Sequence, residues 1–130
     1  MKKILALLLT IFTAFGLASC NGYSSSYVAT KFIKQEVNGH CQAEFESLKG
    51  RYVFKLRKSG DDGEIAYSGS LEEGVLHVYY DSLGTKELLF SLKAGERVED
   101  CGGYFEGGST VFIILETVGT AKGSVYIDLV

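Results

Sequence analysis

Residues 41–57 have the sequence CQAEFESLKGRYVFKLR, and this stretch decides the fold class. Apolar and polar side chains alternate one by one on both sides of Lys49-Gly50. The apolar members are Cys41, Ala43 and Phe45 before the glycine and Tyr52, Phe54 and Leu56 after it. Because successive side chains of a strand point to opposite faces, this period of two predicts two half-buried strands, 41–46 and 51–57.

The same period continues toward the C-terminus. Further strands are expected at 64–69, 75–80, 86–92, 96–101, 110–117 and 124–130, separated by glycine-rich or acidic turns. Residues 27–37 are compatible with a short helix, but their β-branched and aromatic content favours an additional edge strand. The predicted fold is therefore an all-β, antiparallel two-layer β-sandwich of jelly-roll type with about eight strands, and a small closed β-barrel is the alternative.

The N-terminus has the pattern of an export signal. Met1, Lys2 and Lys3 form a short positive segment, and the apolar residues 4–16 that follow are fewer than the roughly 20 that a membrane-spanning helix needs. Ser24-Ser25-Ser26 is small, polar and suited to a flexible tether. We expect a signal peptide at 1–19, Cys20 and a tether at 20–26, and one domain at 27–130.

The residues around the expected cleavage point add a more specific hypothesis. Leu17-Ala18-Ser19-Cys20 resembles the lipobox of bacterial lipoproteins, in which small residues precede a cysteine that becomes the new N-terminus. The resemblance implies diacylglycerol on the Cys20 sulfur, usually with a further acyl chain on its amine, and hence an extracytoplasmic protein that is lipid-anchored to the cell membrane or outer membrane. The alternative is an ordinary secretory signal that leaves Cys20 as a plain thiol.

Charge and composition exclude some classes of partner. The chain has 13 Lys and Arg against 16 Asp and Glu, and without Lys2 and Lys3 of the signal peptide the net charge is −5. A nucleic-acid-binding domain needs a basic face, so no nucleic-acid partner is expected. With 46% hydrophobic residues, including eight Tyr and eight Phe, the chain can bury a core.

Two cysteines remain once Cys20 is assigned to lipid. Outside the cytoplasm a disulfide persists, so we predict a Cys41–Cys101 bond, which would close a loop of about 60 residues and stabilise the fold by roughly 4 kcal/mol. Two reduced, buried thiols are the alternative. His40 and His77 are the only histidines and no cysteines are closely paired, so neither a zinc site nor any other metal or cofactor is expected.

The sequence gives little support to catalysis. No residues with the pattern of a nucleophile and its base surround either histidine. Asp61, Asp62 and Glu64 could hold calcium, but the same residue types favour a hairpin turn, and no EF-hand spacing is present. We therefore predict a protein that is not an enzyme.

Six residues are candidates for ligand binding. If Leu76 and Val78 face the core, their neighbours on the strand face outward, and the same holds next to Val125 and Ile127. The outward residues, together with a glycine-bracketed aromatic pair, are His77, Tyr79, Tyr126, Asp128, Tyr104 and Phe105. Tyrosine rings offer an apolar plane with a polar edge that can stack on a sugar ring. The alternative is that these residues only form cross-strand pairs that stabilise the sheets.

Other segments resemble small lipoproteins of bacterial surfaces. The segments are Lys93-Ala94-Gly95-Glu96, Gly102-Gly103-Tyr104-Phe105-Glu106-Gly107-Gly108 and Gly123-Ser124-Val125-Tyr126. This resemblance implies a β-sandwich without an assigned activity. The sequence thus predicts a lipid-anchored, non-catalytic binding protein whose partner is a glycan or an envelope protein.

A second resemblance supplies the alternative function. Ser68-Gly69 and Lys122-Gly123 are similar to the Ser-Gly and Lys-Gly motifs of the lipoprotein inhibitors of lysozyme, although the flanking residues depart from that pattern. This resemblance implies an envelope lipoprotein that inhibits lysozyme.

Overall fold

The computed structural model describes residues 23–130, and every regular element within that range is a β-strand. The strands are β2 (Ser26–Val28), β3 (Lys31–Val37), β4 (His40–Arg57), β5 (Gly63–Asp81), β6 (Glu87–Lys93), β7 (Arg97–Phe105) and β8 (Thr110–Leu129). All strand pairs are antiparallel and belong to one sheet. The predicted signal peptide and Cys20 lie outside these residues. Within residues 23–130 no helix is long and apolar enough to cross a membrane.

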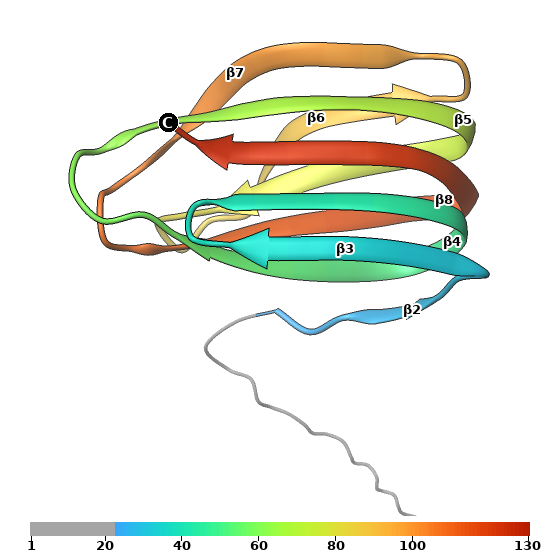
Figure 1. Cartoon of the computed structure of the whole chain (residues 1–130), viewed down its shortest axis with the longest axis horizontal. Coiled ribbons are helices and arrows are strands. Elements are labelled where there is room, and N and C mark those ends of the chain that lie inside the picture. The colour runs from blue at the N-terminus through green and yellow to red at the C-terminus, as the bar shows by residue number, and fades with distance from the viewer. Residues whose placement is uncertain (1–22) are drawn as a thin grey trace, which may run out of the picture.

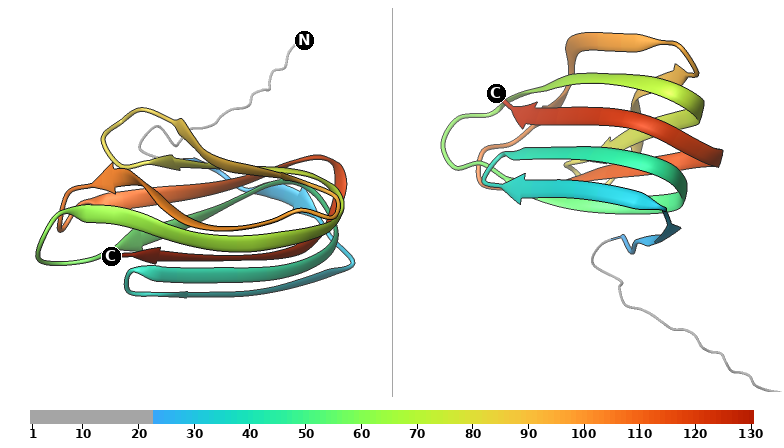
Figure 2. Two further views of the ribbon diagram at one scale, coloured as in Figure 1. Left: turned by 90° about the horizontal axis from the view of Figure 1, so that it is seen from above. Right: turned by 45° about the vertical axis from the view of Figure 1, so that its right-hand side comes forward.

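Three long strands, β4, β5 and β8, each contribute to both layers of the molecule (Figure 1). The first halves of β4 and β5 pair with the second half of β8, and their second halves pair with its first half. The front layer therefore has the order β3-β4-β8-β5-β7, and the back layer has the order β2-β4-β8-β5-β6. Figure 2 shows the two layers from above. The predicted antiparallel β-sandwich of jelly-roll type is confirmed, and the sheet is not closed into a barrel.

Glycines mark the places where the long strands bend from one layer into the other. Gly50, Gly74 and Gly119 have positive φ angles of 121°, 88° and 70°, and the strand registers shift close to the first two. A Cβ on Gly74 would lie 2.1 Å from the carbonyl oxygen of Thr120, so only glycine fits where β5 and β8 bend together. Three segments that the sequence predicted as turns are thus bends within continuous strands. Residues 23–130 form seven strands, whereas about eight were expected, and two of the seven, β2 and β3, confirm strand structure in 27–37.

The core lies between the two layers and consists of the apolar side chains that the alternation predicted. Its largest fully buried members are Phe45, Phe54, Phe105, Leu48, Leu56, Ile65, Leu71, Leu76, Ile113, Leu115 and Ile127. Tyr67 of the front layer stacks on Phe90 of the back layer, with ring centroids 4.6 Å apart and planes at 11°. Each buried side chain of this size contributes about 1.5–3 kcal/mol, so the interior holds the two layers in a fixed relation.

The predicted disulfide is wrong, because both cysteines are free. Cys41 points into the core from β4, whereas Cys101 is exposed on the outer side of β7. Strands β8 and β5 lie between β4 and β7, which separates the two backbones by about 14 Å at the usual strand spacing. A disulfide needs Cα atoms within about 7 Å. Burial also raises the pKa of the Cys41 thiol, which keeps it protonated and unreactive.

Candidate functional site

The outward side chains of the front layer, which we call the front face, form rows that cross four strands from β4 to β7. The strand registers set side by side Glu44, Ser124, Ser70 and Arg97 in one row, Gln42, Tyr126, Ser68 and Glu99 in the next, and His40, Asp128, Ala66 and Cys101 in the third. These residues belong to four segments that are far apart in the sequence. The residues that precede and follow them in each strand point inward, toward the core. The alternation that builds the core therefore also builds this face.

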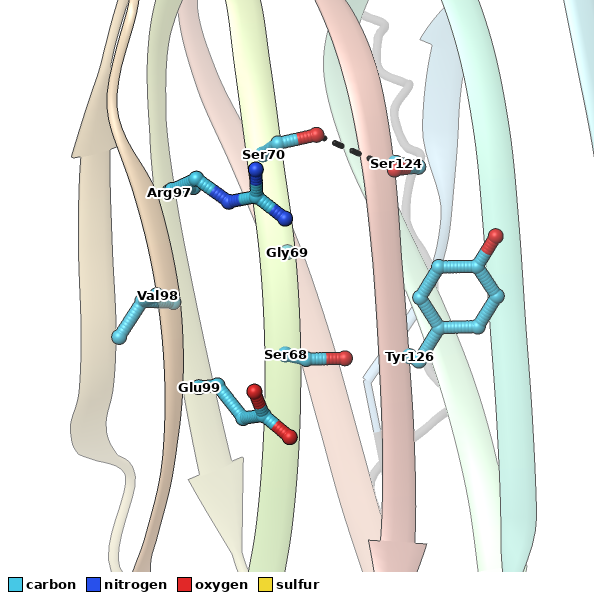
Figure 3. A pocket seen from close by; sticks show the side chains of 8 residues that line it. All are labelled: Ser68, Gly69, Ser70, Arg97, Val98, Glu99, Ser124 and Tyr126. Carbon is cyan, nitrogen blue, oxygen red and sulfur yellow. Dashed lines mark hydrogen bonds between the residues drawn. The ribbon is translucent and has the colours of Figure 1, made fainter.

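A groove runs along β5 on the front face because the outward side chains of that strand are small. Ser68 and Ser70 form its floor, Arg97 and Glu99 of β7 form one side, and Tyr126 of β8 forms the other (Figure 3). The central hollow has a volume of about 370 Å³. A hollow of about 290 Å³ shares three of its lining residues and extends toward Asp128, and one of about 190 Å³ shares two and extends toward Lys122. The three hollows form one shallow, open groove, which we call the front groove.

The polar groups of the front groove can recognise a ligand rich in hydroxyl groups. Serine hydroxyls both donate and accept hydrogen bonds, the Arg97 guanidinium donates, and the Glu99 carboxylate accepts. Within residues 23–130 no ion pair engages Arg97 or Glu99, so both remain available. The half-buried ring of Tyr126 supplies an apolar plane beside these groups.

One end of the groove is organised by a histidine. The two ring nitrogens of His40 lie 2.7 Å from Oδ1 of Asp128 and 3.0 Å from Oε1 of Gln42. Both partners accept hydrogen bonds from the protonated ring. The hydrogen bond to Gln42 is the largest cause that raises the pKa of His40, and the contact with Asp128 raises it further, whereas burial of the ring acts in the opposite direction. The predicted site residue Asp128 is therefore held in place at the groove end by a neighbouring strand.

The predicted site residues His77 and Tyr79 are not on the same face of the sandwich as Tyr126. They lie on the outward side of the back layer, which we call the back face, and face Glu116 and Ile114 of β8. Nδ1 of His77 lies 2.7 Å from the hydroxyl of Ser91, and the ammonium of Lys86 lies 4.4 Å from the ring centroid of Tyr79.

His77 and Ser91 do not form a hydrolytic triad with Glu116. Oε2 of Glu116 accepts hydrogen bonds from Lys86 at 2.6 Å and from Arg51 at 3.2 Å. Burial alone would raise the pKa of Glu116, but together these two cations lower it. The carboxylate is therefore engaged by two cations and does not orient the imidazole.

The glycine-bracketed aromatic pair is not part of the groove. Phe105 has no exposed surface and belongs to the core, so its prediction as a ligand-binding residue is wrong. Tyr104 is 44% exposed, and its hydroxyl donates a hydrogen bond of 2.9 Å to Asp62. Asp62 also accepts a bond from the backbone N–H of Gly107, and these two bonds lower the pKa of its carboxyl. Asp62 thus connects two loops, and among the described residues no cluster of three or more candidate metal ligands occurs.

Sequence reasoning missed most of the groove. Ser70, Ser124, Arg97 and Glu99 were not among the predicted site residues, and only the pairing of β5 with β7 and β8 places them together. Ser68-Gly69 and Lys122-Gly123, singled out for another reason, lie on this face as well. Ser68-Gly69 lies within β5, and Lys122-Gly123 lies within β8.

Comparison with known proteins supports the fold. No family model and no curated protein matches the chain. Among solved structures, TmCBM61 in complex with β-1,4-galactotriose has a TM-score of 0.51 and 14% identity, over 81% of this chain and 83% of that chain. A mutant of the family 29 carbohydrate-binding module CBM29-2 complexed with mannohexaose has a TM-score of 0.44 and 13% identity, over 81% and 77%. The chain shares its β-sandwich fold with TmCBM61.

Proposed function

We propose that this protein is a non-catalytic glycan-binding protein and that the front groove is its binding surface. The observation that carries the proposal is the groove itself, an open trough with a serine floor, one charged side and one aromatic side. The fold shared with TmCBM61, which is described in complex with β-1,4-galactotriose, supports the same class of ligand.

The arrangement of the groove suits a sugar chain better than a compact charged ligand. A pyranose ring has an apolar face that stacks on a Tyr ring and equatorial hydroxyls that bond to side chains at its edge. Arg97 and Glu99 lie on one side of the serine floor and Tyr126 lies on the other, with its ring extending toward β4 (Figure 3), so an oligosaccharide that crosses the groove can contact both sides. From Ala66 to Ser70 the floor extends about 14 Å, at the usual rise per strand residue, which leaves room for more than one ring.

Binding to a glycan panel tests this proposal. The soluble fragment 21–130 is applied to immobilised galactose-, mannose- and glucose-based oligosaccharides and to peptidoglycan fragments. We expect saturable binding to at least one neutral oligosaccharide, with free sugar of the same structure competing. A panel without any specific binding would contradict the proposal and shift the search to a protein partner.

We further propose that the protein is anchored by lipid at Cys20 on the extracytoplasmic side of a membrane. The proposal rests on the lipobox-like segment that ends at Cys20. We expect the full chain to incorporate labelled palmitate and to sediment with membranes, and Cys20→Ala to lose both properties because the acylated sulfur is missing. Ser24→Ala is the matched control and keeps both. Unchanged membrane partitioning of Cys20→Ala would exclude lipid anchoring at this residue.

A further inference from the structure

The N-terminal residues of the described chain are held on the back face. The Tyr23 hydroxyl donates a hydrogen bond of 2.5 Å to Asp81, and its ring contacts Phe112 edge-on with centroids 5.3 Å apart. The hydroxyl of Ser25 accepts a bond of 2.9 Å from the backbone N–H of Val53. Residues predicted to belong to a flexible tether thus contact β4, β5 and β8.

The buried carboxylate of Asp81 holds Tyr23 in place on the back face. Its side chain is buried, and its second carboxylate oxygen accepts a hydrogen bond of 2.7 Å from the backbone N–H of Gly84. The hydrogen bond to Asp81 is the main reason that the pKa of Tyr23 rises to about 12, so the tyrosine hydroxyl stays protonated and donates throughout the physiological pH range. The chain therefore leaves the domain at one defined point on the back face.

Little chain separates this point from the proposed lipid. Three residues lead from Tyr23 back to Cys20, and an extended chain of that length spans at most about 11 Å. If Cys20 carries the lipid, the back face cannot move far from the membrane surface.

The side chains of the back face suit such a surface. Arg51, Lys55 and Arg57 project outward from β4, and Lys86 lies above Tyr79 and shares Glu116 with Arg51. Their acidic neighbours are Glu116, which Arg51 and Lys86 share, Asp81, which is bonded to Tyr23, and Glu36, whose carboxylate accepts a hydrogen bond from the backbone N–H of Lys55. Positive side chains are attracted to anionic lipid headgroups, and tyrosines such as Tyr23 and Tyr79 are typical of the membrane interface.

The front face has the opposite character. Its carboxylates are Glu44, Glu46, Glu72, Glu99 and Asp128, against the cations Lys31, Arg97 and Lys122. An anionic membrane surface repels such a face and attracts the back face.

We infer that the back face lies against an anionic membrane surface and that the front groove consequently points away from it, toward the space outside. The inference rests on the lipid anchor proposed for Cys20. It gives the anchor a second role, because one attachment point and one basic face together orient the groove outward.

Spin labels on the two faces test the orientation in the full, lipidated chain. The native thiol of Cys101 reports on the front face, and Leu88→Cys in a Cys101→Ser chain reports on the back face, where Leu88 is 55% exposed beside Tyr79. Each protein is reconstituted into vesicles of phosphatidylcholine and anionic phosphatidylglycerol. We expect the label at position 88 to collide several-fold less often with a water-soluble nickel complex than the label at position 101, and more often with oxygen dissolved in the bilayer.

The outcomes separate the orientation from the anchor. If the protein does not float with the vesicles, the anchor and with it the orientation are refuted. If it floats but the two labels collide equally with the nickel complex, the anchor stands and the orientation is refuted. In the double variant Lys55→Glu, Arg57→Glu the label at position 88 should become accessible to nickel while the protein still floats. Continued protection in that variant would refute the role of the basic side chains.

Discussion

Replacing Tyr126 with alanine should weaken binding to any oligosaccharide found on the panel by about 30-fold, the effect of losing a central contact residue worth about 2 kcal/mol. Tyr126 supplies the aromatic side of the front groove, between the serine floor and Gln42 of β4. Its outward ring is not part of the core, so the fold should persist. Titration calorimetry with the soluble fragment measures the dissociation constant, and the unfolding midpoint shows whether the variant is folded.

The chain itself offers a matched control for this prediction. Tyr79 is also an outward tyrosine, on β5 beside the central strand β8, but it lies on the back face next to Ile114. Tyr79→Ala should leave glycan affinity unchanged, and Tyr126→Phe should retain most of it because the ring is kept. Equal losses in Tyr79→Ala and Tyr126→Ala would place the ligand elsewhere and contradict the groove.

The strand pattern of this protein was predictable because alternation is a local property. Side chains such as Ala43, Phe54 and Ile127 are buried as their position in the alternation requires. The connections were less predictable, because a glycine with a positive φ angle serves a turn and a bend equally well. At Gly74 the chain does not turn back as a hairpin but continues as the same strand into the second layer. Only its pairing with the neighbouring strands determines which of the two occurs.

The candidate site was predictable only in part, because alternation separates inside from outside but does not tell the two outer faces apart. Tyr79 and Tyr126 have the same local pattern, yet the bends of β5 and β8 place them on opposite sides of the sandwich. The cysteine pairing failed for a related reason. Cys41 points inward from β4 and Cys101 points outward from β7, and these two strands are not neighbours. Only the order of the strands in the sheet shows this, and the local sequence does not contain it.

Gly74→Ala should lower the free energy of unfolding by about 2–5 kcal/mol. An alanine pays roughly 1–2 kcal/mol for a left-handed backbone conformation, here at a φ of 88°. Its Cβ would also lie 2.1 Å from the carbonyl oxygen of Thr120 and 2.9 Å from the Cα of Ala121, and relieving such contacts costs about 1–3 kcal/mol more. Thermal unfolding should show a drop of about 10 °C or more in Tm.

Gly95→Ala isolates the contribution of the contact. Gly95 has a φ of 89°, nearly the same as that of Gly74, but a Cβ there would meet nothing within 4 Å. Its substitution should therefore cost only the conformational part, about 1–2 kcal/mol. The difference between the two variants measures how closely β5 and β8 pack where both strands bend between the layers. If the two variants lose the same stability, that close approach does not constrain the bend, and backbone conformation alone explains the glycine.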